Sequence, residues 1–178
     1  NSFAQTGIGH GTDKAILAGL LGFEKSDRCI KNSFELAHKR GVKFNFIRIP
    51  NAVDYLPNSA KIDMLSDKWH IEVVGASIGG GLIVIQTIDG FEVNFTGDYE
   101  TLIVTHRDKI GVLAKVLTIL SEHKMNVVSI NSVRHNKIED IKTVITLDNY
   151  IQQEIYYELI KLPNIIRVRI IHLLQENW

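Results

Sequence analysis

The run Gly9-His10-Gly11-Thr12-Asp13 holds the residue types best suited to chemistry in this chain. A histidine ionises near neutral pH, so it can accept or donate a proton during a reaction. The flanking glycines lack a Cβ, which lets the backbone approach a ligand closely. The same run also fits a capped turn whose histidine only completes hydrogen bonds. The pattern therefore leaves a catalytic and a structural interpretation open.

A helix over residues 14–21 must position this loop. Thr12 or Asp13 is a suitable N-cap, because a short oxygen-bearing side chain can accept a hydrogen bond from the first turn. The helix is apolar on nearly every face, which predicts that it is buried and holds the loop rigidly.

A second glycine-rich run, Ser77-Ile78-Gly79-Gly80-Gly81, lies between two predicted strands. Its backbone could cradle the carboxylate of a small substrate. Consecutive glycines between strands are also typical of a β-bulge or a hairpin turn, and we favour this structural interpretation.

Composition and charge exclude several classes of function. The 178 residues are 45% hydrophobic and carry 20 basic and 20 acidic side chains. Neither a nucleic-acid partner nor a membrane partner is expected, because the chain has no basic excess and no apolar run of about 20 residues. The chain begins at Asn1 without a methionine or a leader, so a fragment or a processed product is expected.

Cys29 is the only cysteine, so no internal disulfide can form. We expect a reducing, cytoplasmic location and a buried, unreactive thiol. One cysteine cannot hold an iron–sulfur cluster, which usually needs about four thiolates. Any such cofactor must lie on another chain.

The pattern predicts an α+β protein of two domains. Residues 1–97 form a mixed α/β domain with two helices, the second striped by Ile30, Phe34 and Ala37 and ended by Gly41. Its expected strands cover residues 42–49, 69–77, 82–88 and 91–95, with a hairpin turn at Asp89-Gly90. Residues 60–65 are expected to form a strand or a turn.

For residues 98–178 the pattern predicts a strand at 101–106, a helix at 111–123, strands at 126–134 and 141–147, a helix at 151–162 and a strand at 165–174. This βαββαβ order is that of the ferredoxin-like fold, in which two helices cover one face of an antiparallel sheet. The open face and the edge strand of such a sheet commonly meet a partner chain.

This second segment resembles an ACT domain, a module that senses small molecules. The resemblance rests on Thr105-His106-Arg107-Asp108-Lys109-Ile110-Gly111-Val112-Leu113 and on Asn126-Val127-Val128-Ser129-Ile130. It implies self-association and an effector site at Asp108, Gly111 and Val112, where N–H groups at a helix start can hold a carboxylate. A solvated loop is the other interpretation of Asp108.

The first segment is similar to the β chain of the iron–sulfur L-serine dehydratases, also called L-serine ammonia-lyases. The similarity rests on Ser2-Phe3-Ala4-Gln5-Thr6-Gly7, the 9–13 loop, Ala18-Gly19-Leu20-Leu21-Gly22 and Gly75-Ala76-Ser77-Ile78-Gly79-Gly80-Gly81. It implies conversion of L-serine to pyruvate and ammonia, together with an α subunit that carries a 4Fe–4S cluster.

The resemblance also assigns roles within this chain. His10 would take or relay the Cα proton of serine as the catalytic residue. The substrate-binding residues would be Gly9, Gly11, Thr12, Asp13, Ser77, Gly79 and Gly80.

Two departures from the family pattern bear on activity. Leu56 precedes Pro57-Asn58-Ser59 where the family usually has a histidine. A strand and a Ser-Ser-His-Thr loop found in the family would lie upstream of Asn1, so we expect an incomplete pocket and no activity without the α partner. The alternative is a non-catalytic, amino-acid-sensing regulatory subunit or a diverged paralogue, because phosphoglycerate dehydrogenases carry both kinds of segment.

Overall fold

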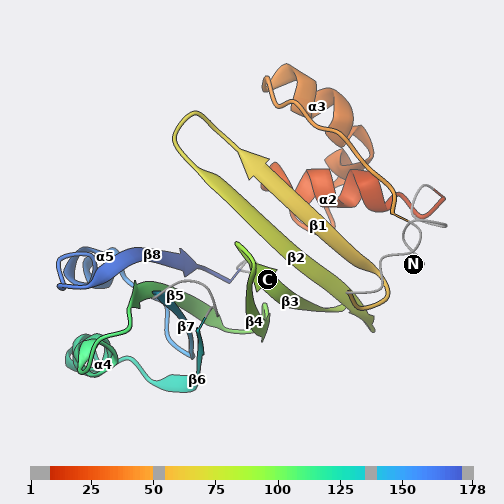
Figure 1. The fold of residues 1–178 in the computed structure, drawn as a ribbon. Coiled ribbons are helices and arrows are strands. Elements are labelled where there is room, and N and C mark those ends of the chain that lie inside the picture. The colour runs from red at the N-terminus through yellow and green to blue at the C-terminus, as the bar shows by residue number, and fades with distance from the viewer. Residues whose placement is uncertain (1–8, 50–54, 135–139, 174–178) are drawn as a thin grey trace. The chain divides into compact units, whose positions relative to one another are not determined.

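The computed structural model describes residues 9–49, 55–134 and 140–173, and divides the chain into two compact units, Asn1–Ala60 and Lys61–Trp178 (Figure 1). The Ser2–Gly7 run, residues 135–139 between the predicted strands 126–134 and 141–147, and the last predicted strand residue, Leu174, lie outside the described residues. The second unit holds both β-sheets. The boundary at residues 97 and 98 falls between these sheets, and as a domain boundary it stays a prediction.

The described residues of the first unit form two short α-helices and a 3-10 helix. These are α2 (Thr12–Leu20), η1 (Arg28–Asn32) and α3 (Ser33–Lys39). The predicted stop at Gly41 is confirmed: its φ is +71°, its N–H bonds to the His38 carbonyl, and the next N–H bonds to Ala37. This pair of bonds is the Schellman motif, which a glycine in the left-handed region permits.

Two predictions for α2 are wrong. The N-cap is Gly11, with φ +69°, so Thr12 and Asp13 lie inside the helix and no side chain caps it. The Asp13 carboxylate pairs with Arg48. Only Leu17 and Ala18 are buried, so the helix buries one narrow face rather than its whole surface. The loop before α2 is therefore held by backbone bonds and one ion pair, not by burial.

The predicted strand at 42–49 is also wrong. These residues are irregular, and no other described strand pairs with them. Their alternation has a different cause, because Phe44 and Phe46 both pack on Phe34 of α3, with ring centroids 5.2 and 5.8 Å away. Alternating apolar and polar residues indicate which side chains face a hydrophobic neighbour, and here that neighbour is a helix.

The first sheet confirms the predicted strands at 69–77, 82–88 and 91–95, and residues 60–65 form a strand rather than a turn. It has the order β1-β2-β3-β4 and consists of β1 (Ser59–Leu65), β2 (His70–Gly79), β3 (Leu82–Ile88) and β4 (Phe91–Thr96). Asp89, with φ +51°, and Gly90, with φ +77°, form the predicted tight turn between β3 and β4.

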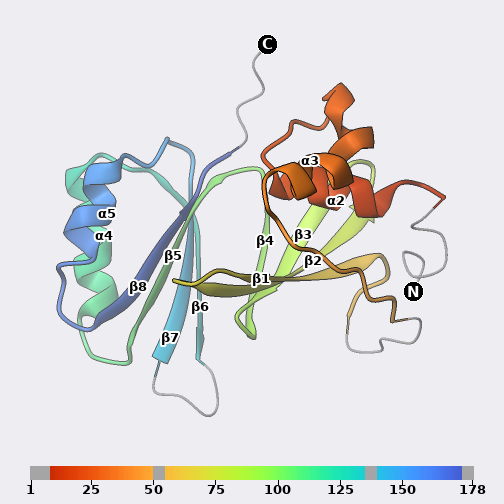
Figure 2. The same ribbon diagram turned by 90° about the horizontal axis from the view of Figure 1, so that it is seen from above.

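The second sheet confirms the βαββαβ order. Its elements are β5 (Glu100–Arg107), α4 (Val112–Glu122), β6 (Val127–Arg134), β7 (Asp140–Leu147), α5 (Gln153–Leu159) and β8 (Ile165–Ile171). The strand order β6-β7-β5-β8 is antiparallel throughout. Figure 2 shows α4 and α5 together on one face of this sheet. The α+β fold class is confirmed.

Two hydrophobic clusters organise the second unit. The larger lies between the β5–β8 sheet and its two helices, and includes Val116, Leu120, Ile155 and Leu159. The smaller joins the opposite face of that sheet to β3 and β4, and consists of Ile88, Val93, Phe95, Ile103 and Val144. The open face that was expected to meet a partner chain is thus partly covered by this chain's own β3 and β4.

Candidate functional site

The His10 loop presents its imidazole to solvent. His10 is exposed, and within the part of the chain that the structure describes no hydrogen bond or ion pair engages its ring. The next residue, Gly11, turns the chain into α2, where its carbonyl accepts from the Ala15 N–H at 3.0 Å. The side chain is therefore available to a ligand or a partner, and the backbone beneath it is fixed.

Asp13 is anchored by a residue that the sequence did not single out. Arg48 Nη2 donates to Asp13 Oδ2 at 2.5 Å, and the two side chains are 38% and 24% exposed. A ligand at this loop would meet an ion pair rather than an isolated carboxylate. No local pattern could reveal Arg48, because 35 residues separate it from Asp13.

The glycine-rich run forms a hairpin turn. Ser77 lies on β2 opposite Ile83 of β3, and Gly79 lies opposite Leu82, with a register shift between them. Gly79, Gly80 and Gly81 have φ of +91°, +62° and +80°, which L side chains rarely adopt. The backbone conformation of the turn is by itself a sufficient reason for three glycines at these positions. This agrees with the structural interpretation that we favoured. Their role in holding substrate stays a prediction.

The two candidate substrate segments belong to different units. Gly9, Gly11, Thr12 and Asp13 lie with His10 in the first, whereas Ser77, Gly79 and Gly80 lie in the second.

The predicted effector loop joins β5 to α4 and is tied down by two ion pairs. Asp108 pairs with Arg134 of β6, and Arg107 pairs with Asp140 of β7 at 2.9 Å. Gly111, with φ +83°, is the N-cap of α4, and no side chain caps this helix. Val112 is buried at 4% exposure, so its side chain serves the core and only its backbone can face a ligand.

A buried histidine supports the same loop. His106 Nδ1 lies 2.9 Å from the Arg107 carbonyl and therefore carries the proton that it donates. Its Nε2 lies 3.0 Å from the Thr143 hydroxyl oxygen, which in turn lies 2.9 Å from the Ser132 hydroxyl oxygen, both within hydrogen-bond distance. This chain of hydrogen bonds crosses three strands. The sequence placed His106 only in or beside a strand.

Cys29 is exposed, so the prediction of a buried thiol is wrong. Asp27 accepts a hydrogen bond from the Cys29 N–H at 2.7 Å, and its carboxylate raises the pKa of the thiol. The thiol is therefore protonated, and less nucleophilic, for an electrostatic reason rather than through burial.

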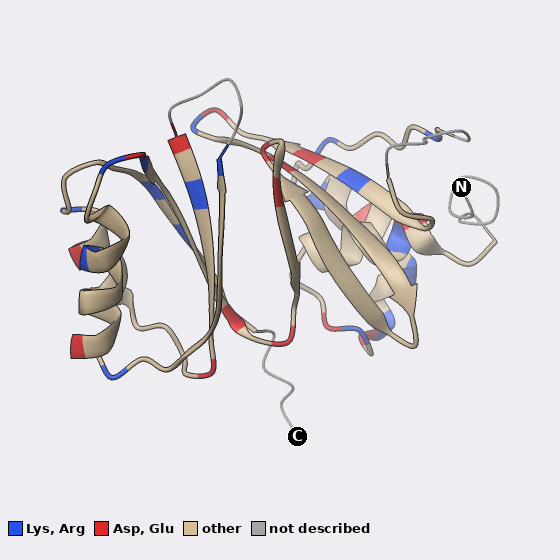
Figure 3. Cartoon of the chain, turned by 60° about the horizontal axis from the view of Figure 1, so that its bottom comes forward, with Lys and Arg blue, Asp and Glu red and all other residues tan. Residues whose placement is uncertain are grey.

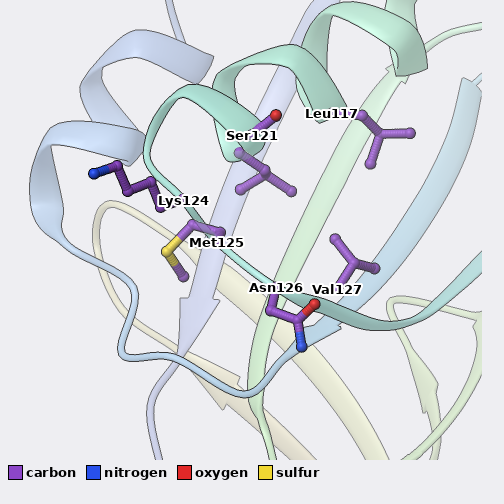
Figure 4. Close-up of a pocket in the computed structure, with 7 residues that line it drawn as sticks. Leu117, Ser121, Lys124, Met125, Asn126 and Val127 are labelled. Atoms are coloured by element: carbon purple, nitrogen blue, oxygen red, sulfur yellow. The ribbon is translucent and has the colours of Figure 1, made fainter.

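A surface pocket lies beside α4 and the start of β6 (Figure 4). It has a volume of about 370 Å³ and is lined by Leu117, Leu120, Ser121, Lys124, Met125, Asn126 and Val127. None of the predicted site residues lines it.

Acidic and basic residues are interspersed along the helices and strands in Figure 3. Among the described residues no helix is long and apolar enough to cross a membrane.

Comparison with known protein families agrees with the fold. The ACT domain model matches residues 101–149, which places the βαββαβ segment in the class of ACT-domain proteins. Over 167 residues the chain is 40% identical to the probable L-serine dehydratase β chain of Bacillus subtilis, covering 94% of this chain and 76% of that protein. The chain belongs to the family of L-serine dehydratase β chains.

Two further relatives refine this assignment. The L-serine dehydratase β chain of Peptoniphilus asaccharolyticus is 40% identical over 80% of this chain, which spans 64% of that protein. The D-3-phosphoglycerate dehydrogenase of Methanocaldococcus jannaschii is 26% identical over 72% of this chain and 24% of that protein. The higher identities favour a dehydratase subunit over the alternative of a non-catalytic sensor.

Proposed function

We propose that this chain acts with an α subunit to convert L-serine to pyruvate and ammonia. The similarity to two dehydratase β chains, carried along most of the chain, is the observation that supports this activity. The exposed His10 loop supplies an ionisable group at a fixed position.

The 4Fe–4S cluster of this reaction belongs, in our proposal, to the α subunit. This chain's donors do not fit a cluster, because Cys29 is its one thiol and the described residues contain no group of three or more His, Cys, Asp or Glu side chains that could hold a metal. An exposed lone thiol also suits a reducing, cytoplasmic location.

His10 contributes proton transfer. Its neutral imidazole takes the proton from Cα of L-serine as hydroxide leaves Cβ, which gives aminoacrylate. That product becomes an imine, and water hydrolyses the imine to pyruvate and ammonia. The Asp13–Arg48 pair and the bond from Ala15 to Gly11 keep the loop in position during this step.

The ACT domain contributes regulation. A small molecule with a carboxylate binds the N–H groups at the start of α4, next to Gly111, where no side chain competes for them. The ion pairs of Arg107 and Asp108 hold the loop that forms this site. The domain also pairs with a second copy.

Reconstitution tests the proposed activity. The chain is produced together with a cluster-bearing dehydratase α chain, and pyruvate formed from L-serine is measured. A parallel pairing of that α chain with the Bacillus subtilis β chain shows that the α chain is competent. We expect pyruvate from both pairs and none from the α chain alone. Copurification without turnover, beside an active control pair, would contradict the proposal.

A further inference from the structure

Asp89 stands where the two sheets of the second unit meet. Its positive φ, +51°, places it in the β3–β4 turn, and two bonds fix it to β2: its N–H donates to the Glu72 carbonyl at 2.8 Å, and its carboxylate accepts from the Glu72 N–H at 3.1 Å. These bonds hold the Asp89 carboxylate in a fixed position relative to the β1–β4 sheet.

Three cations of the β5–β8 sheet surround this carboxylate. Arg169 Nη1 lies 2.6 Å from Asp89 Oδ2, Lys142 Nζ lies 3.4 Å away and Arg167 Nη1 lies 4.0 Å away. Lys142 is on β7 and the arginines are on β8, so they reach Asp89 from both sides of β5. We call these four residues the Asp89 cluster.

Buried Lys142 stabilises the contact between the two sheets at the Asp89 cluster. Its side chain is only 2% exposed; its ammonium donates to the Ile88 carbonyl at 2.9 Å and lies 4.4 Å from the centre of the Phe91 ring. A buried ammonium is costly unless partners surround it. The three partners here are Asp89 in the β3–β4 turn, Ile88 at the end of β3 and Phe91 at the start of β4. Separating the sheets would leave this cation without them.

Strand β7, which contains Lys142, also contacts the effector loop. Asp140, two residues earlier on β7, pairs with Arg107. Ser132 and Arg134 on β6 pair with Thr143 and Ile141 of β7 in the sheet, and Arg134 bonds Asp108. A change in the 107–111 loop therefore reaches β7 directly, and β7 contacts the β3–β4 turn through Lys142.

We propose that the Asp89 cluster is a rigid joint that transmits occupancy of the 107–111 loop, by a small carboxylate-bearing molecule, to the β1–β4 sheet that carries Ser77–Gly80. The transmission of ligand binding rests on the proposed regulatory role of the ACT domain. The rigid contact between the two sheets at the Asp89 cluster does not depend on that role.

Amide hydrogen exchange of the intact chain tests the joint without any ligand. Asp89→Asn keeps the shape of the side chain and removes its charge. We expect exchange of residues 82–96 and 140–147 to quicken at least tenfold. The matched control is Asp63→Asn, the same change on the same sheet at an exposed pair with His70, and we expect no change there. Unchanged exchange at both segments in Asp89→Asn would overturn the proposal.

A second variant covers the case in which Asp89→Asn does not fold. Arg169→Gln removes the closest cation and leaves Lys142 and Arg167 beside Asp89. We expect faster exchange in the same two segments, by threefold or more, with residues 112–122 unaffected. Uniformly faster exchange over the whole chain would show a general loss of stability. It would also contradict the proposal that the Asp89 cluster is a rigid joint.

L-Serine is the probe for transmission. In the wild-type chain we expect it to slow exchange at 107–111 and at 82–96, and in Asp89→Asn at 107–111 alone. Equal slowing at 82–96 in both proteins would overturn transmission through the cluster. Absence of any slowing at 107–111 would instead count against L-serine as the effector, and the ligand-free comparison would still decide the joint.

Discussion

A glycine in the left-handed region begins each of the helices that follow the two candidate ligand loops. Gly11 starts α2 with φ +69°, and Gly111 starts α4 with φ +83°; neither helix has a side-chain cap. The first-turn N–H groups thus stay free of side-chain acceptors, which suits an anionic ligand better than an N-cap serine would. The glycines beside His10 were predicted to let the backbone approach a ligand, and Thr12 or Asp13 was predicted as a cap that α2 does not use.

Gly111→Ala tests the conformational role of this glycine. No atom lies within 4 Å of an added Cβ, so the cost is the left-handed backbone alone, about 1–2 kcal/mol. Gly19→Ala in α2 also has open space but ordinary helical angles, and we expect it to stabilise by about 0.5–1 kcal/mol. Urea unfolding of both variants measures the two effects. Equal changes of the same sign would contradict the account.

Asp89 gives stability a defined dependence on pH. Burial alone would raise the pKa of its carboxyl, but hydrogen bonds from Arg169 and the Glu72 N–H, with the charges of Arg169 and Lys142, lower it below the ordinary value. A lowered carboxyl pKa contributes stability above the unfolded value of about 3.9, and that stability is lost as pH falls through the folded value.

The corresponding prediction compares wild type with Asp89→Asn between pH 7 and pH 3. The wild-type chain should be more stable at pH 7, and the difference should shrink as pH falls below about 4. Urea midpoints at each pH provide the measurement. A difference that stays constant down to pH 3 would show that the charge of Asp89 is not the source of the stability.

At the scale of elements, the sequence predicted those structures whose cause is local. The apolar stripe of α4, the Asp89-Gly90 turn and the glycine stop after α3 are each decided by neighbours within a few residues. The 42–49 segment was mispredicted because its alternation is real, but whether an alternating segment becomes a strand depends on a second strand with free hydrogen-bonding groups. Phe34 of α3 supplied the apolar contact instead.

Helix α5 offers an element-scale test with a built-in control. Leu159 is fully buried against the β5–β8 sheet, whereas the adjacent Ile160 is 43% exposed. Leu159→Ala should cost about 2–5 kcal/mol through the lost contacts and the cavity. Ile160→Ala should cost less than about 1 kcal/mol. Thermal and urea unfolding distinguish them, and comparable losses would mean that α5 is packed differently.

At the scale of the molecule, the sequence predicted two compact layers of the ACT fold but not what covers its open face. The contact of Ile88, Val93 and Phe95 with Ile103 and Val144 depends on the tertiary arrangement. The same holds for the Asp89 cluster, in which Lys142 and Arg169 are 53 and 80 residues from Asp89. No local spacing encodes such pairs, although the residue types are ordinary. The predicted substrate residues are likewise split between two units, which no local pattern could decide.

The edge strand β6 provides a test of self-association. Val128 and Ile130 are 44% and 41% exposed on this edge, an arrangement that favours pairing with another strand. We expect the wild-type chain to sediment as a dimer or larger species, and Ile130→Lys to shift it toward the monomer at least tenfold in dissociation constant. Tyr157→Lys on the exposed side of α5 is the control, since Tyr157 is 51% exposed away from the edge. An equal shift in both variants would contradict pairing at β6.

We propose that His10 moves the Cα proton of L-serine in the assembled enzyme. The most direct measurement is the turnover number for pyruvate formation by the reconstituted pair carrying His10→Ala, with His38→Gln as the control histidine of the same unit. We expect His10→Ala to lower kcat by about 10²–10⁴-fold with KM little changed, and His38→Gln to retain activity. Wild-type turnover in a stably assembled His10→Ala complex would contradict the account.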